Sequence, residues 1–232
     1  MIITIKNLGK NFGEKSIYKN LNLSLKEGEV FALIGPNGVG KTTLMRLILD
    51  WDTDYTGQIE KKEGLTIGYS PEIPNFPQIL KGQEVLEYFM EIRGIEKKER
   101  EKRSKELMDL VGLPLEADTQ VANYSKGMKQ RLGVAQSLIG DPDLILLDEP
   151  SAGLDFFGQI QMQRLIQSLK EKGKTILLNS HLLYDVEKIC DRGIIVMGKD
   201  KYRNFEKKDF SQESLPEMFL RLAEEGKHES LY

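Results

Sequence analysis

The sequence predicts an α/β fold in which helices cover a mostly parallel β-sheet. One observation is that apolar runs typical of buried strands alternate with segments of helical spacing in the C-terminal half. In order, these are a strand from residue 144, a helix at 156–170, a strand at 175–179, a helix at 183–189 and a strand at 193–196. A second observation is a strand, a glycine-rich loop and a helix in direct succession at 30–49. Such alternation indicates a parallel sheet, because each crossover needs a connecting segment, usually a helix.

Shorter strands are predicted in the N-terminal third. Alternating or apolar residues mark candidate strands at 2–5, 20–25, 30–34, 58–61 and 65–69. Pro71, Pro74 and Pro77 then interrupt regular structure. From Gln83 the apolar spacing is helical, and residues 96–106 predict a charge-dense helix. We interpret residues 73–140, approximately, as a helical subdomain inserted into the sheet.

An apolar stripe lies near the C-terminus. It consists of Leu215, Met218, Phe219 and Leu222, which have helical spacing. We expect the stripe to pack on the chain's own body, and the alternative is that it faces a partner.

A glycine-rich loop indicates the class of ligand. It matches the phosphate-binding pattern G-x-x-x-x-G-K-[ST] and reads Gly35-Pro36-Asn37-Gly38-Val39-Gly40-Lys41-Thr42. Gly35, Gly38 and Gly40 lack a Cβ, so the backbone can adopt positive φ and approach an anion closely. The N–H groups at the start of the following helix favour negative charge. We predict that Lys41 reaches the β- and γ-phosphates and that the Thr42 hydroxyl ligates Mg²⁺.

Two adjacent acids end a second buried strand. The segment reads Leu144-Ile145-Leu146-Leu147-Asp148-Glu149-Pro150. Open α/β sheets place their ligands at the carboxyl ends of the strands, which suits a phosphate and Mg²⁺ site here. We expect Asp148 to hold Mg²⁺ through water and Glu149, on the opposite face of the strand, to polarise the attacking water as a general base. Taken alone, the segment also fits a strand that ends in a solvated acidic turn.

Ser125 and His181 are further candidates, each with a structural alternative. Ser125 suits the N-cap of a helix that continues to residue 139, and a helix N-terminus with a free hydroxyl can bind an anion. His181 follows the strand at 175–179 and could hydrogen-bond a γ-phosphate and the attacking water. The alternatives are a plain capped helix and a structural histidine.

The composition is that of an ordinary soluble globular domain. The 232 residues are 40% hydrophobic and 30% charged, and the net charge is −3, which gives no nucleic-acid footprint. Cys190 is the single cysteine and is expected to be a small buried apolar residue. The sequence contains no apolar run of 18 residues that would span a membrane. A cytoplasmic location follows, with any membrane role coming through a partner.

Together and in this order, these motifs resemble the ATP-binding cassette (ABC) ATPases over roughly residues 2–223. In that family, Tyr124-Ser125-Lys126-Gly127-Met128 corresponds to the signature motif, usually Leu-Ser-Gly-Gly-Gln. Other matches are Phe12 with the aromatic that stacks on adenine, Tyr69-Ser70-Pro71-Glu72 with a loop that usually carries Gln, Ser151-Ala152-Gly153-Leu154-Asp155 with the D-loop, and His181 with the switch histidine.

The chain departs from the family pattern at two motifs. Glu72 replaces the Gln that normally meets Mg²⁺ and the attacking water; a carboxylate can ligate Mg²⁺ but adds negative charge. Lys126 replaces the first signature Gly, and Met128 replaces the Gln. Ser125 and Gly127 are kept, so the phosphate contact should survive. Both departures resemble export-type members.

The resemblance implies a P-loop NTPase core with a mostly parallel sheet, an N-terminal antiparallel β subdomain and the inserted α-helical subdomain. It implies a single ABC ATPase domain over residues 1–225, followed by a polar tail at 226–232. Two cassettes would dock head to tail around ATP, and the partners would be a transmembrane permease subunit and a second ABC ATPase subunit, identical or different. The loop after Pro71 would touch the permease, with Phe76, Ile79 and Leu80 as candidate contacts and local packing as the alternative.

The expected cofactors are ATP and Mg²⁺, and the motifs and the resemblance together give the expected site residues. The catalytic residues are Glu149, His181 and Lys41; the nucleotide-binding residues are Phe12, Gly35, Pro36, Asn37, Gly38, Val39, Gly40, Lys41, Thr42, Thr43, Ser125, Gly127 and Asp155; the metal-binding residues are Thr42, Glu72 and Asp148.

Two functions remain open at this stage. The first is the ATPase subunit of a membrane transporter, more in keeping with export. The second is a soluble ATP-switched scaffold or assembly factor that uses the same cassette. DNA-maintenance relatives carry a long coiled coil between phosphate loop and signature, and residues 49–123 are too short for one. Translation-associated relatives usually carry two cassettes, whereas this chain has one phosphate loop.

Overall fold

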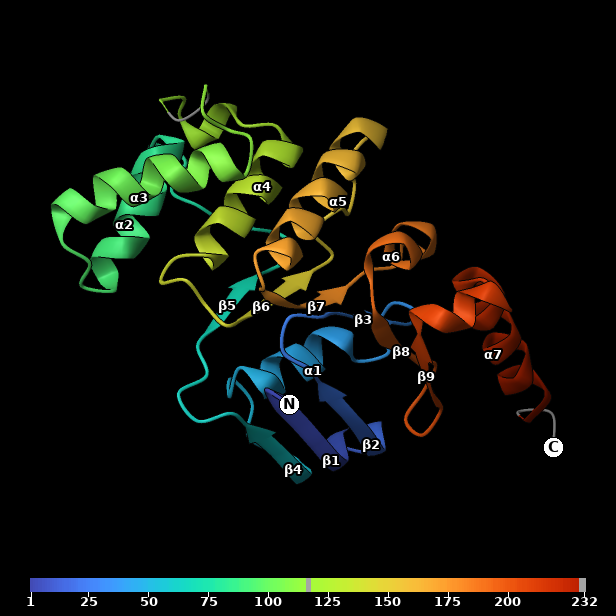
Figure 1. Cartoon of the computed structure of the whole chain (residues 1–232). Coiled ribbons are helices and arrows are strands. Elements are labelled where there is room, and N and C mark those ends of the chain that lie inside the picture. The colour runs from blue at the N-terminus through green and yellow to red at the C-terminus, as the bar shows by residue number, and fades with distance from the viewer. Residues whose placement is uncertain (116–117, 230–232) are drawn as a thin grey trace.

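Two β-sheets and seven α-helices make up the part of the chain that the structure describes, residues 1–115 and 118–229 (Figure 1). The structure is a computed structural model. A three-stranded antiparallel sheet lies at the N-terminal end of the chain, and a six-stranded sheet lies beside it with helices over its other face. The predicted α/β fold, with a mostly parallel sheet, an antiparallel N-terminal sheet and an inserted helical segment, is confirmed.

The larger sheet has the strand order β5-β6-β7-β3-β8-β9. Its first five strands are parallel, and β9 pairs antiparallel with β8. The strands are β3 (Val30–Ile34), β5 (Ile67–Ser70), β6 (Leu144–Asp148), β7 (Thr175–Asn179), β8 (Arg192–Val196) and β9 (Tyr202–Glu206). Every residue of β3, β6 and β7 is buried, because helices and the second sheet cover both faces.

The smaller sheet pairs β1 (Ile3–Phe12) with β2 (Lys15–Leu25) on one side and β4 (Thr56–Lys61) on the other. The sequence underestimated β1 and β2, which were expected only at 2–5 and 20–25. The register of β1 shifts after Ile5, where Asn7 adopts a positive φ of 51°. Such an irregularity breaks the two-residue alternation on which the sequence prediction depends.

Helices lie on both sides of the larger sheet. They are α1 (Lys41–Ile48), α2 (Gly82–Ile92), α3 (Lys97–Leu110), α4 (Lys126–Ser137), α5 (Phe156–Glu171), α6 (Leu183–Ile189) and α7 (Leu215–Glu229), with short 3₁₀ turns at Val121–Asn123 and Lys207–Ser211. Helix α1 packs between the two sheets, where Leu44, Met45 and Leu47 join a core with residues of both. Helices α2 to α4 form a lobe at the β5 side of the sheet, far from the antiparallel sheet (Figure 1).

The C-terminal region contains one strand that the sequence analysis missed. In β9 only Phe205 is buried, so the polar sequence of this edge strand gives no apolar signal. The predicted apolar stripe packs inward as expected, since Leu215 and Met218 are buried in α7. Helix α7 continues to Glu229, and the rest of the expected tail, 230–232, lies outside the described residues. Cys190 is fully buried, and burial raises its pKa to about 12.

One predicted partner contact proves to be a core residue. Phe76 is only 6% exposed and packs edge-on against Phe89 of α2, with ring centroids 6.3 Å apart. It therefore cannot meet a permease, and the local-packing alternative is correct for this residue. Ile79, three residues later, is 79% exposed. Leu80 is partly buried against the core.

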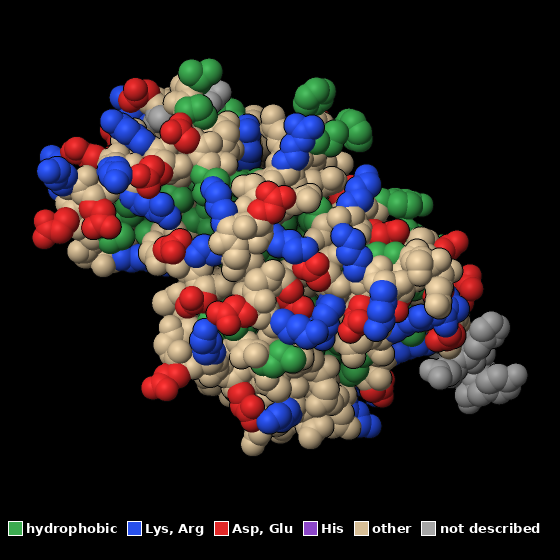
Figure 2. Space-filling view, viewed as in Figure 1, with side chains coloured by type: hydrophobic (Ala, Val, Ile, Leu, Met, Phe, Trp, Pro, Cys, Tyr) green, Lys and Arg blue, Asp and Glu red, His purple; other side chains and the backbone are tan. Residues whose placement is uncertain are grey.

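No helix in residues 1–115 and 118–229 is both long and apolar enough to cross a membrane. Figure 2 shows basic and acidic side chains interspersed over one face of the molecule. This mixed face agrees with the net charge of −3.

Candidate functional site

The glycine-rich loop joins the buried strand β3 to α1 and is held in shape by close packing. Gly40, the N-cap of α1, has a φ of 117°, which L side chains rarely adopt, and a Cβ there would approach Tyr18 Oη to 3.1 Å. Gly35 does not have a positive φ; a Cβ at this position would collide with the carbonyl oxygen of Val196 on β8. The need for glycine thus has two causes: lack of space at both positions, since a Cβ at Gly40 would also collide with the Ile17 side chain, and a positive φ at Gly40 alone.

Lys41 lies inside this loop. It is buried, and its Nζ donates to the carbonyl oxygens of Gly35 at 2.7 Å and Pro36 at 3.1 Å. Burial lowers the pKa of Lys41, and the charges of nearby carboxylates, Glu149 foremost, oppose that shift. The ammonium group is thus held at the centre of the loop, in position to meet an anion.

Asp148, at the end of β6, accepts hydrogen bonds from three side chains. The Thr42 hydroxyl donates to it at 2.9 Å and the Tyr69 hydroxyl at 3.3 Å, and the Asn179 amide donates to its other oxygen. Burial and the charge of Asp148 raise the pKa of Tyr69 to about 12. Thr42 and Asp148 thus bring two hard oxygen donors together, as a Mg²⁺ site requires. The described residues contain no group of three or more His, Cys, Asp and Glu side chains that could hold a metal ion, here or elsewhere, so a Mg²⁺ ion at this site would depend on the Thr42 hydroxyl and on ligands from outside the chain.

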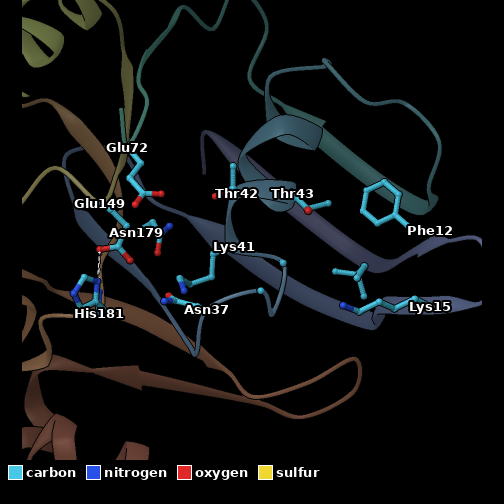
Figure 3. A pocket seen from close by; sticks show the side chains of 13 residues that line it. Phe12, Lys15, Asn37, Lys41, Thr42, Thr43, Glu72, Glu149, Asn179 and His181 are labelled. Carbon is cyan, nitrogen blue, oxygen red and sulfur yellow. Dashed lines mark hydrogen bonds and ion pairs between the residues drawn. The ribbon is translucent and has the colours of Figure 1, made fainter. Parts of the chain in front are cut away.

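Glu149 and His181 form a pair beside this cluster. His181 Nδ1 lies 2.7 Å from Glu149 Oε2, and the two side chains point toward each other in Figure 3. Glu149 is buried and has a φ of 51°, an uncommon value for a residue other than glycine. Its N–H donates to the Asn179 carbonyl at 2.9 Å, which anchors the turn to β7. Such strain is found where a side chain is held for function.

A pocket with a volume of about 450 Å³ unites these groups (Figure 3). The expected site residues that line it are Phe12, Asn37, Gly38, Gly40, Lys41, Thr42, Thr43, Glu72, Glu149 and His181. Phe12 lies at one end of the pocket, and Glu72, Glu149 and His181 lie at the other. The backbone of exposed Glu72 is tied to α4, since its carbonyl accepts from Gln130 Nε2 at 2.6 Å. An aromatic ring at one end and the Lys41 loop further along offer contacts to a ligand that has both an aromatic and a phosphate part.

Three residues of the pocket were missed by the sequence analysis: Lys15, Ile17 and Asn179. Asn179 is the one with a sequence signal, because a polar residue ends the apolar strand β7 just as Asp148 ends β6. The two residues are paired across the parallel strands. Lys15 and Ile17 lie in the part of β2 that the sequence did not predict to be a strand.

Ser125, Gly127 and Asp155 do not line the pocket. Ser125 is the N-cap of α4 and accepts from Met128 N–H at 3.2 Å, which confirms the predicted cap. Asp155 caps α5 in the same way, accepting from Gly158 N–H at 2.7 Å. The first turns of the two helices are neighbours, since a Cβ on Gly127 would lie 3.5 Å from Leu154. This second group of expected nucleotide-binding residues is therefore separate from the first within one chain.

Comparison with known protein families gives a match over residues 18–152 to the family described as ABC transporter. A lantibiotic transport ATP-binding protein of Streptococcus pyogenes is 35% identical over 226 residues, which cover 94% of this chain and 96% of that protein. A bacitracin transport ATP-binding protein of Bacillus licheniformis is 40% identical over 210 residues, covering 85% and 68%.

An uncharacterized ABC transporter ATP-binding protein of Synechocystis is 44% identical over 184 residues. The match covers 75% of this chain and 52% of that protein, so the chain spans about half the length of this relative. Among solved structures, an ATP-binding subunit of an ABC transporter has a TM-score of 0.81 at 26% identity and covers 96% of this chain and 99% of its own. A dimeric bacterial ABC transporter cassette has a TM-score of 0.78 at 27% identity, covering 88% and 98%.

Proposed function

This chain belongs to the ABC transporter family, and from that membership we propose that it is the ATP-binding and ATP-hydrolysing subunit of a transporter. The observation that carries the proposal is the pocket in which Lys41, Thr42 and the Glu149–His181 pair meet, with Asp148 hydrogen-bonded to Thr42 just behind its lining. Phosphoryl transfer to water requires a cation that binds the phosphates, oxygen ligands for Mg²⁺, and a general base, which here lies beside a histidine.

The roles of these groups follow from their positions. Lys41 and the loop N–H groups bind the phosphates of ATP, and Phe12 at the far end of the pocket stacks on the adenine base. Glu149 takes a proton from the attacking water, and His181 holds the carboxylate in place through the 2.7 Å contact. Thr42, Asp148 and Glu72 would hold Mg²⁺, which neutralises phosphate charge when bound.

The separation of Ser125, Gly127 and Asp155 from the pocket supports an active form with two cassettes. In one chain these residues cap two neighbouring helices but do not reach the pocket. A second ABC ATPase subunit, identical or different, supplies them head to tail to the γ-phosphate bound by the first. Binding of ATP then closes the pair, and hydrolysis loosens it. The dimeric cassette among the structural relatives supports this arrangement.

The remaining partner is a transmembrane permease subunit, which would keep the cassette at the cytoplasmic face of the membrane. Its contact surface includes the exposed Ile79 and the neighbouring Ile73, which is 78% exposed. Two relatives named for the transport of bacitracin and of a lantibiotic support a role in transport. The replacements at Glu72, Lys126 and Met128 favour export. We assign the whole of residues 1–225 to the single ATPase domain, with an inserted lobe at about 73–140.

Hydrolysis of ATP by the purified chain tests the proposal. A general base contributes about 10²- to 10⁴-fold, so Glu149→Gln should lower phosphate release by about 100-fold or more while ATP still binds. The matched control is Glu171→Gln, an exposed glutamate at the end of α5. Near-normal hydrolysis by Glu149→Gln would remove Glu149 from the catalytic role.

A further inference from the structure

Phe12 is the one aromatic side chain that lines the pocket, and little of the protein core supports it. It is the last residue of β1 and is 51% exposed. A half-exposed phenylalanine at a strand end samples several rotamers, and a ligand that stacks on it must immobilise the ring at an entropic cost. A ring that is already fixed binds a base more tightly for the same contact area.

A buried cation lies against this ring. Lys10 Nζ is 4.7 Å from the centroid of the Phe12 ring. Lys10 precedes Phe12 by two residues on β1, and the register of the strand shifts between them, so the contact is a feature of this strand end and does not follow from regular alternation. Lys10 is 2% exposed, whereas lysine is almost never fully buried unless it is paired. A cation near an aromatic face is attracted by the ring, and more strongly when it is shielded from water.

The ammonium group of Lys10 is itself fixed by the loop that follows α1. It contacts the Asp52 carboxylate at 2.8 Å and the Asp54 carboxylate at 3.3 Å, and it donates to the Asp54 carbonyl at 2.6 Å. Burial lowers the pKa of Lys10, but its bonds to Asp52 and Asp54 outweigh that effect and raise the pKa above its usual value. The charge therefore stays on Lys10, and its position does not depend on Phe12.

The same loop continues from the phosphate-binding helix. Helix α1 begins at Lys41 and ends at Ile48, and the two anchoring acids follow within six residues. One short stretch of chain thus begins at the phosphate end of the pocket and fixes the cation over the Phe12 ring at the other end. The helix in this stretch is packed between the two sheets.

We propose that Lys10 is a positioning residue for nucleotide binding, which holds the Phe12 ring by a cation–π contact so that the ring's exposed part stacks on the base. The proposal rests on the proposed function, since it requires a base at Phe12. Lys10 does not line the pocket, so it acts through Phe12 without touching the nucleotide. Its effect should therefore depend on the presence of a base and leave the phosphate end unchanged.

The test compares the dissociation constants of ATP and inorganic tripolyphosphate, measured by calorimetry on the full chain. Lys10→Met keeps the length of the side chain and removes the charge. We expect it to weaken ATP binding about threefold to tenfold and to leave tripolyphosphate binding unchanged. The matched control is Lys6→Met, which removes an exposed lysine from the same strand, ion-paired to Glu60 at 2.7 Å.

A second background separates positioning from a general structural role. In a Phe12→Ala chain, Lys10→Met should cause no further loss of ATP affinity. If the Lys10→Met variant does not fold, the double variant Lys10→Met/Asp52→Asn takes its place in the same comparison, because it removes the charge of Asp52 together with that of Lys10. The Asp52 side chain is 23% exposed, so an amide is tolerated there. An equal loss for tripolyphosphate, an equal loss in both backgrounds, or no loss at all would overturn the proposal.

The failure of the proposed function gives a different result. If Phe12→Ala leaves the ratio of ATP to tripolyphosphate affinity unchanged, no base stacks on Phe12, and both the adenine placement and the role of Lys10 are wrong. If Phe12→Ala lowers ATP affinity but Lys10→Met does not, the adenine placement holds and only the role of Lys10 is overturned.

Discussion

Asp148 and Glu149 are neighbours in the chain, yet their carboxylates have different partners. Asp148 accepts from Thr42 and Tyr69, whereas Glu149 faces His181. The positive φ of Glu149 separates them, because it turns the backbone directly after the strand. At the scale of the residue, one backbone torsion thus gives two adjacent acids different surroundings, which suit the proposed metal ligand at Asp148 and the proposed base at Glu149.

Lys41 offers a direct test of the phosphate end. Its Nζ is held by two loop carbonyls in a largely buried position, where an anion in the pocket would meet the charge. We expect Lys41→Ala to lower ATP affinity by about tenfold or more, equivalent to about 1.4 kcal/mol. Calorimetric titration with ATP measures this, and Lys19→Ala, an exposed lysine on β2, is the control. Unchanged affinity would contradict the assignment of the loop.

Glu72 is the residue at which this chain departs from the usual glutamine. It borders the pocket at the end that holds Glu149. If its carboxylate ligates Mg²⁺, Glu72→Gln replaces a charged ligand by a neutral one, and the Mg²⁺ concentration for half-maximal hydrolysis should rise severalfold. The control is Glu63→Gln, on an exposed turn. An identical Mg²⁺ titration for wild type and Glu72→Gln would exclude a metal contact.

At the scale of the element, the loop before α2 divides between the core and the surface. Phe76 is buried against Phe89, and Ile79 is exposed three residues later. Proline-rich sequence gives no periodicity from which this division could be predicted. Only the packing of Phe76 against α2 shows which of the apolar side chains is buried and which is exposed.

This division predicts that two alanine substitutions change the free energy of unfolding by very different amounts. Phe76→Ala should lower the free energy of unfolding by about 3 kcal/mol, because it leaves a cavity in the core of the lobe. Ile79→Ala should change it by less than about 0.5 kcal/mol, since the side chain is exposed. Urea denaturation followed by circular dichroism measures both. Equal stabilities would mean that Phe76 is not a core residue.

At the scale of the whole molecule, the residues expected to bind the nucleotide fall into two groups. One group lies in or beside the pocket, and the other begins α4 and α5. A single chain cannot bring them to one phosphate in this conformation. Two copies related head to tail would do so twice, once at each pocket, which is why ATP itself would join them.

A charge at Ser125 tests this arrangement. Aspartate is as good an N-cap as serine, so Ser125→Asp keeps α4 but places a carboxylate against the γ-phosphate of the partner's ATP. In the Glu149→Gln background, size-exclusion chromatography with MgATP should show a dimer, and Ser125→Asp should abolish it without loss of ATP binding. Ser214→Asp, before α7, is the control. A dimer that persists with Ser125→Asp would place the interface elsewhere.

The sequence by itself determined the α/β fold, the buried strands β3, β6 and β7, and the order of the motifs at their ends. These follow from local patterns, since an apolar run, a glycine loop and a cap each need only neighbouring residues. Only the tertiary structure decided that Asn179 bonds Asp148, that Phe76 is buried and that the Lys10 ammonium lies over the ring of Phe12. Each of these depends on which strand or loop lies beside another, and that choice is made by packing across segments far apart in the chain.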